Sequence, residues 1–232
     1  RAKLGLATTP DTQKKMRELG CRNVLLYPES GLPSQEILRL ATIPEHHQIP
    51  FRAISIGRLL HWKGFDLGMR GFAAAQTHLK NSEYWIVGEG PERERLEQLA
   101  RELQIDHQVR FWGSLPREQT LGKLRECAVL MHPSLHDSGG WVCLEAMAAG
   151  RPVICLDHGG PGVQVTENTG IKVRPGDPEQ VVADIASALT RLEQDPEFRR
   201  ALSNSGRKRV HDFFSWDCKG DWINDVYLSC TT

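Results

Sequence analysis

The sequence predicts an α/β fold with a doubly wound parallel sheet, Rossmann-like in its layout. From residue 51 onward, short apolar segments alternate with segments of helical length, a rhythm typical of parallel βαβ units. Several of the apolar segments end at a glycine or a proline, as strands leading into loops do. A chain of 232 residues can bury a core of this kind without disulfides or metal ions to stabilise it.

The beginning of the chain does not read as a complete domain. Strands are expected at residues 4–7 and 24–27, with a helix at 10–19 that a threonine and a proline begin and a glycine ends. We interpret residues 1–31 as the remnant of an N-terminal domain. Residues 32–50 are polar and without a clear period, and we interpret them as an irregular linker.

Regular alternation follows the linker, and it defines one domain over residues 51–212. Its expected strands span residues 51–56, 84–87, 109–111, 128–131, 153–156 and 171–173. Its expected helices span residues 65–79, 92–103, 117–127, 141–149, 178–193 and 196–210. A last helix is expected at residues 216–228, within a C-terminal segment over 213–232.

Residues 132–156 carry the clearest signs of a ligand site. A buried strand leads into a polar loop with Gly139 and Gly140, and a helix follows that ends at Gly150. Glycines at such a turn let the backbone approach a ligand closely, and the first N–H groups of a helix bind anions. This stretch therefore predicts an anion site.

Two carboxylates flank this turn. Asp137 precedes the glycines, and Glu145 lies inside the helix among apolar neighbours. The spacing alone favours a solvent-facing position for Glu145 on an amphipathic helix over a functional one.

The loops after the expected strands should meet at one edge of the sheet. The carboxyl ends of parallel strands lie together, and ligands of open α/β sheets bind there. These loops carry the following glycines, charged residues and aromatic residue: Arg58, Lys63, Gly88–Gly90, Trp112-Gly113, Asp137–Gly140 and Gly159-Gly160. Neither a G-x-G-x-x-G motif nor a P-loop is present in the sequence.

Composition limits the kinds of partner. Lys plus Arg equals Asp plus Glu, 29 each, so we expect no nucleic-acid partner, although a local phosphate site stays open. The six cysteines form no C-x-x-C pair, and a proline separates His132 from His136, so we expect no metal site. The sequence has no signal peptide and no long apolar run, which predicts no transmembrane segment and a cytoplasmic location.

A set of short motifs occurs in a fixed order along the chain. They are Gly57-Arg58-Leu59, Lys63-Gly64, Gly88–Pro91, Val109–Gly113, Pro133-Ser134, Asp137-Ser138 and Glu145–Val153. Each motif is weak alone, but the ordered set resembles the donor-binding C-terminal domain of the large retaining glycosyltransferase family with the GT-B fold (family four, group 1). The match covers residues 51–228. Residues 1–31 are similar to the end of that family's N-terminal domain, and 213–232 to its crossover helix.

The resemblance implies a nucleoside diphosphate sugar as donor, a UDP-sugar in our expectation, and no cofactor. Arg58 and Lys63 would hold the diphosphate in place of a divalent metal, and the N–H groups of Trp141 and Val142 would add to this. Glu145 would accept hydrogen bonds from the ribose hydroxyls. The structural alternative is that Arg58 and Lys63 are ordinary surface charges.

The resemblance also implies how the transferred hexose is held. Asp137, Ser138 and the backbone of Gly139 and Gly140 would contact it. The family usually has two glutamates eight positions apart, whereas here the first is Asp137. The shorter side chain withdraws the carboxylate by ~1.5 Å, about one C–C bond.

The base would be bordered by two further loops in the family. Gly88 and Gly90 form one, and Trp112 and Gly113 the other. In the structural alternative, Gly88 and Gly90 only make a tight turn, and Trp112 only packs against the core.

Three functions remain open at this point. The first is a retaining transferase that moves a hexose-type sugar to a glycan, lipid or small-molecule acceptor, in the cytoplasm or at the inner face of a membrane. The second is a non-catalytic nucleotide-sugar-binding module, and the third is a GT-B-like epimerase. The acceptor would lie on the N-terminal domain, and residues 1–31 are too few to enclose it. We therefore expect this chain to bind donor without transferring sugar, with Asp137 and Gly139 facing solvent.

Overall fold

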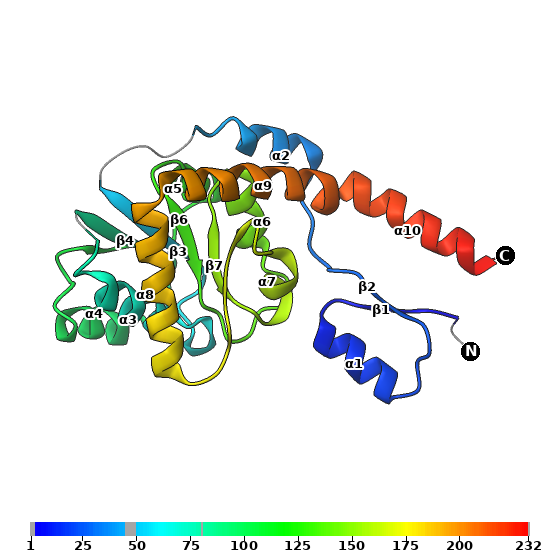
Figure 1. The fold of residues 1–232 in the computed structure, drawn as a ribbon, viewed down its shortest axis with the longest axis horizontal. Helices are drawn as coiled ribbons and strands as arrows, with labels where there is room; N and C mark the ends of the chain where they lie inside the picture. The colour runs from blue at the N-terminus through cyan, green and yellow to red at the C-terminus, as the bar shows by residue number, and fades with distance from the viewer. Residues whose placement is uncertain (1–2, 45–49, 80, 232) are drawn as a thin grey trace.

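The computed structural model describes residues 3–44, 50–79 and 81–231. Its centre is a parallel sheet with helices on both faces (Figure 1). The strands are β3 (Phe51–Ile56), β4 (Ser82–Val87), β5 (Val109–Gly113), β6 (Val129–His132), β7 (Val153–Leu156) and β8 (Gly170–Val173). They lie in the order β5-β4-β3-β6-β7-β8, and all neighbours are parallel. The predicted doubly wound sheet is confirmed.

Helices and one 3-10 turn connect the strands. They are η1 (His61–Lys63), α3 (Phe65–Ala75), α4 (Arg93–Glu102), α5 (Arg117–Arg125), α6 (Trp141–Ala148), α7 (Gly159–Gln164), α8 (Pro178–Gln194) and α9 (Pro196–Phe214). The predicted helices are present, although α3 ends at Ala75, before the expected residue 79. A short helix, α7, begins in the glycine-rich stretch after β7. Among the described residues, none of the helices combines the length and the apolar character that a membrane span requires.

Both faces of the sheet are buried because helices cover each of them. Tyr84 and Ile86 of β4 belong to a core cluster with α3, α4 and α8. Trp85 and Val87 belong to the opposite cluster, with α5, α6 and α9. Successive strand residues point to opposite faces, so burial on both faces requires the near-continuous apolar runs in the sequence.

The sheet reverses its order of connection between β3 and β6, which lie side by side although the chain visits β4 and β5 between them. Ligands of doubly wound sheets bind outside the carboxyl ends of the strands at such a switch point. We call residues 133–140, between β6 and α6, the Asp137 loop. Because β6 is the neighbour of β3 in the sheet, this loop lies next to η1, which follows β3.

The N-terminal residues form a second, two-stranded parallel sheet. Its strands are β1 (Gly5–Ala7) and β2 (Val24–Leu26), joined by α1 (Pro10–Glu18), as expected. In Figure 1 this unit lies to one side of the main sheet, below the last helix, α10 (Trp216–Thr231).

The expectation of irregular structure over residues 32–50 is wrong for Ser34–Ala41, which form α2. Ile37 and Leu40 are buried on one face of this helix. Two apolar residues three positions apart in an eight-residue helix leave too short a pattern to detect in a polar segment. Residues 45–49 of the same predicted linker, like 1–2 and 232, lie outside the described residues. The predicted domain boundaries remain predictions.

Candidate functional site

Asp137 is the centre of a hydrogen-bonded polar cluster at the switch point. Its Oδ2 atom lies 2.6 Å from Lys63 Nζ and 3.0 Å from His132 Nε2. Its Oδ1 atom accepts hydrogen bonds from the backbone N–H groups of Gly139, at 3.2 Å, and Gly140, at 2.9 Å. The carboxylate thus joins the ends of β3 and β6 to the start of α6.

These contacts keep the Asp137 carboxyl ionised. Burial by itself would raise the pKa of Asp137, but the hydrogen bonds from His132, Lys63 and the Gly140 N–H outweigh it and hold the pKa below its ordinary value. The structure therefore brings together the cation predicted for the diphosphate and the carboxylate predicted for the sugar. Their roles toward a donor remain predictions.

A glycine in the turn after η1 places Lys63 beside the Asp137 loop. Gly64 has a φ of +65°, and a Cβ atom on it would lie 2.0 Å from the carbonyl oxygen of Pro133. The same two segments also meet where the Leu135 N–H donates to the Trp62 carbonyl, at 2.8 Å. Backbone packing, rather than side-chain packing, thus sets the distance between Lys63 and the Asp137 loop.

The start of α6 has the features of the predicted anion site. Gly140 precedes it with a φ of +54°, which favours glycine. Trp141 and Val142 are the first residues of the helix, so their N–H groups have no intrahelical partner. Ser138 is exposed next to this helix start.

The expectation that Asp137 and Gly139 face solvent is wrong. The side chain of Asp137 is 15% exposed, and Gly139 is buried. The side chains of Trp141 and Glu29 lie close to the Cα atom of Gly139, within 3.0 and 3.5 Å of where a Cβ atom would be. Glu29, in the segment after β2, therefore covers part of this loop.

Glu145 is buried, 7% exposed, so the solvent-facing alternative for this residue is wrong. Its carboxylate accepts a hydrogen bond from Arg117 Nη1 of α5, and Nη2 of the same guanidinium donates to Glu36 of α2. Burial raises the pKa of Glu145, and Arg117 offsets this only in part. A role for Glu145 toward ribose remains a prediction.

Arg58 lies at the same edge of the sheet. It is exposed, and no ion pair to its side chain is found within residues 3–44, 50–79 and 81–231. Its guanidinium is thus available to an anion, whereas the ammonium of Lys63 is already paired with Asp137.

Gly88 and Gly90 make close backbone contacts. Gly88 has a φ of +141°, and a Cβ atom there would lie 1.8 Å from the Gly57 carbonyl oxygen. Gly90 has a φ of +158°, and its Cβ atom would lie 2.4 Å from the Leu59 carbonyl oxygen. The two glycines hold the loops after β3 and β4 together, as the structural alternative expected. Whether they also border a base stays a prediction.

Trp112 packs against the core. Its ring meets the Trp85 ring edge-on, with 5.0 Å between centroids, and Lys123 Nζ lies 3.8 Å from its centroid. The carbonyl of Gly113 accepts a hydrogen bond from the Gly88 N–H, at 2.8 Å. The structural interpretation of Trp112 is supported, and contact with a base remains a prediction for both residues.

Sequence reasoning missed two residues at this site. The spacing of His132 and His136 indicates no metal site and predicts no other role for His132, yet its ring donates to Asp137. No local pattern distinguishes Arg117 from other charged residues at a helix start. The signal for His132 was available, because a histidine that ends a buried strand before a proline must have a polar partner nearby.

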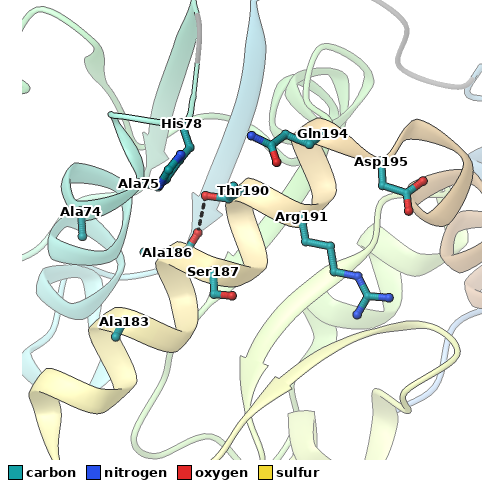
Figure 2. A pocket seen from close by; sticks show the side chains of 10 residues that line it. All are labelled: Ala74, Ala75, His78, Ala183, Ala186, Ser187, Thr190, Arg191, Gln194 and Asp195. Atoms are coloured by element: carbon teal, nitrogen blue, oxygen red, sulfur yellow. Dashed lines mark hydrogen bonds between the residues drawn. The ribbon is translucent and has the colours of Figure 1, made fainter.

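A hollow elsewhere on the molecule is unrelated to this site. It lies between α3 and α8 and is lined mainly by small side chains, with Ala75, His78, Ala186 and Thr190 among them (Figure 2). Both helices run back along the sheet from the carboxyl edge, so their C-terminal ends lie at the edge opposite the Asp137 loop. The dashed bond in Figure 2 joins the Thr190 hydroxyl to the Ala186 carbonyl within α8, at 2.9 Å.

Comparisons with known proteins agree with the fold. A family model described as "Glycosyl transferases group 1" matches residues 42–209. The chain is 33% identical, over 95% of its length, to the lipopolysaccharide core biosynthesis glycosyltransferase LpsD of Rhizobium meliloti, and it covers 61% of that protein.

Solved structures show the same architecture. Sucrose-phosphate synthase from Thermosynechococcus elongatus is 26% identical with a TM-score of 0.76, and the match covers 100% of this chain and 59% of that one. Anabaena Alr3699/HepE, solved in complex with UDP, shares the fold at 20% identity and a TM-score of 0.77, with 98% of this chain and 64% of that one covered. The chain thus spans less than two thirds of each of these three relatives. It belongs to the group 1 glycosyl transferases and corresponds to the C-terminal domain of a GT-B glycosyltransferase.

Proposed function

We propose that this chain binds a UDP-sugar at the switch point between β3 and β6, as the donor-binding part of a retaining hexosyltransferase that needs no metal ion. The observation that carries the proposal is the convergence of Arg58, Lys63 and the start of α6 at one edge of the sheet. Two cations and a helix N-terminus together neutralise a diphosphate as a divalent cation would.

Arg58 and Lys63 would bind the diphosphate in different ways. Arg58 is exposed and binds a phosphate oxygen directly. Lys63 is held by Asp137 and shares its ammonium between the carboxylate and the phosphate, because an ammonium has three donors. The Trp141 and Val142 N–H groups would complete the anion site.

The leaving group then determines the chemistry. A nucleoside diphosphate departs with a negative charge that grows toward the transition state, so groups fixed around it lower the barrier more than they tighten ground-state binding. Glu145 would accept hydrogen bonds from ribose, and the Asp137 loop would face the sugar. The acceptor would be a glycan, lipid or small molecule bound by other parts of a longer protein.

The solved structures of one similar protein support the choice of nucleotide. Anabaena Alr3699/HepE was solved in complex with UDP and, in another structure, with UDP-glucose.

Titration calorimetry with UDP-, GDP- and ADP-sugars in the presence of EDTA tests the proposal. We expect a UDP-sugar to bind, and the Arg58→Ala, Lys63→Ala double variant to lose at least about tenfold in affinity, since each lost charged contact costs about 1.5–3 kcal/mol. Arg200→Ala is the matched control, because Arg200 is an exposed arginine on α9 that pairs with Glu197. A strict need for Mg²⁺ or Mn²⁺, or equal losses in control and double variant, would overturn the proposal.

A further inference from the structure

Gln164, the last residue of α7, joins three segments of the chain through one side chain. It is fully buried, 0% exposed. Its Nε2 atom donates to the hydroxyl of Ser30, at 2.6 Å, and to the carbonyl of Gly139. Ser30 is also 0% exposed and precedes α2 by only a few residues. One carboxamide thus connects α7, the Asp137 loop and the chain that comes from β2.

The orientation of this carboxamide is fixed by its partners. A carbonyl such as that of Gly139 only accepts hydrogen bonds, so the NH₂ group must face it. The Oε1 atom then points at Gly140, where a Cβ atom would lie 2.7 Å away, and it finds no donor among the described residues. The two hydrogen bonds of the NH₂ group therefore hold the carboxamide in place.

The residues around Ser30 are also held by hydrogen bonds to the end of α9 and to α10. We call Tyr27–Leu32 the connecting segment; it runs from β2 to α2 past the junction of α9 and α10 (Figure 1). The Leu32 N–H donates to the Phe214 carbonyl, at 2.8 Å, and the Trp216 N–H donates to the Leu32 carbonyl, at 3.0 Å. Lys219 of α10 donates to the Pro28 carbonyl. The connecting segment therefore lies between α10 and the Asp137 loop.

The peptide group between Gly139 and Gly140 passes a displacement on to the charged residues. Its carbonyl, that of Gly139, accepts from Gln164, and its N–H, that of Gly140, donates to Asp137 Oδ1, as the N–H of Gly139 also does. Asp137 in turn holds Lys63. A shift of the Gly139 carbonyl therefore moves the carboxylate and the ammonium as well.

We propose that Gln164 is a positioning residue that couples the connecting segment to the Asp137 loop, so that the geometry at Asp137 depends on the hydroxyl of Ser30. The coupling runs through hydrogen bonds between residues that are far apart in the sequence. Its consequence for sugar binding rests on the proposed function, whereas its effect on the loop does not.

Amide hydrogen exchange followed by NMR tests the coupling without any ligand. In Ser30→Ala and in Gln164→Met, we expect the Gly139 and Gly140 amides to exchange about tenfold faster than in the unaltered chain, while amides of β3 keep their rates. Ser203→Ala is the matched control, because it removes a buried hydroxyl whose hydrogen bond, to the Arg199 carbonyl at 2.9 Å, stays within α9. A merely structural role would speed exchange throughout the chain or leave the two glycines unaffected, and either result would overturn the proposal.

Calorimetry with UDP and a UDP-sugar then separates this inference from the proposed function. If the coupling affects sugar binding, Ser30→Ala weakens UDP-sugar binding several-fold more than UDP binding. Adding Gln164→Met to Ser30→Ala then causes little further loss of affinity, because both substitutions remove the same hydrogen bond between Gln164 and Ser30. Faster exchange at the glycines with no ligand binding in the unaltered chain refutes the proposed function and supports the coupling. Normal UDP-sugar binding in both variants, with unchanged exchange, refutes the coupling alone.

Discussion

The ammonium group of Lys63 lies 2.6 Å from the carboxylate of Asp137, although 74 positions separate the two residues in the sequence. The pair spans the switch point of the sheet, since Lys63 follows β3 and Asp137 follows β6. A phosphate that binds Lys63 must therefore share it with a carboxylate that is itself ionised. Asp137 thus neutralises part of the positive charge of Lys63 but fixes the position of its ammonium group.

Replacing Lys63 by methionine tests whether its ammonium group binds the diphosphate. We expect Lys63→Met to weaken UDP binding about tenfold or more, because a charged hydrogen bond worth about 1.5–3 kcal/mol is lost, and calorimetry measures the change. Lys208→Met provides the control, since Lys208 also pairs with an aspartate, Asp212 at 2.8 Å, but on the exposed surface of α9. Similar affinities for UDP in the two variants would show that Lys63 does not bind the diphosphate.

The ionised state of Asp137 predicts a pH dependence of stability. Its folded-state pKa lies below the ordinary value of 3.8, so its stabilising effect is complete above pH 3.8 and is lost as the pH falls through the folded-state pKa. Denaturant unfolding should show Asp137→Asn to be less stable by about 1.5–3 kcal/mol at pH 7. The difference between the two proteins should stay constant down to the ordinary carboxyl range and shrink below it. A difference that already shrinks between pH 7 and 5 would contradict the lowered pKa.

The main sheet could be predicted because its central strands β3, β6 and β7 are largely buried on both faces and read as apolar runs. Strands such as Phe51–Ile56 and Val153–Leu156 agree with their predicted ends for this reason. The rim of the sheet could be predicted as well, because parallel strands place their carboxyl ends together.

The pairing of charged and polar side chains could not be predicted. Glu145 meets Arg117, and Gln164 meets Ser30, through contacts between elements whose relative rotation no local pattern specifies. Arg151 shows the same limit: it belongs to a motif that carries the resemblance, yet it is 1% exposed and donates to the Leu124 carbonyl at the end of α5. Periodicity identifies which face of a helix is apolar, but not which polar group finds a partner inside.

Glu145 should distinguish a nucleoside from a bare diphosphate. If its carboxylate accepts hydrogen bonds from ribose, Glu145→Gln should weaken UDP binding about tenfold and leave pyrophosphate binding unchanged. Calorimetry with the two ligands measures this difference. Because glutamine keeps the shape of the side chain, the thermal midpoint should show that the domain is intact. Equal losses for both ligands would mean that Glu145 acts on the site only through the fold.

The close approach of Gly64 to Pro133 predicts a loss of both stability and binding. Gly64→Ala places a Cβ atom 2.0 Å from a carbonyl oxygen at a φ of +65°, so the backbone must move. We expect a loss of about 1–3 kcal/mol in the free energy of unfolding and weaker UDP binding, since the turn carries Lys63. Gly122→Ala is the control, because Gly122 lies in α5 and, apart from its chain neighbours and the backbone of its own helix, no atom lies within 4 Å of its Cβ position, so the change should be neutral or stabilising. Equal stability of the two variants would show that the turn adapts freely.

Asp137 accepts hydrogen bonds from the N–H groups two and three positions later, a local geometry that short side chains favour. Glutamate at this position is ~1.5 Å longer, and it would give up these bonds to reach toward the sugar. We therefore expect Asp137→Glu to change the affinity for a UDP-sugar by a larger factor than the affinity for UDP, and to alter the preference among UDP-hexoses in calorimetric titrations. Asp157→Glu is the control, since Asp157 pairs with Lys172 in the same manner, at 2.8 Å, beyond β7. If the Asp137 variant changes UDP and UDP-sugar affinities by the same factor, its carboxylate does not face the sugar and serves the Lys63 ammonium alone.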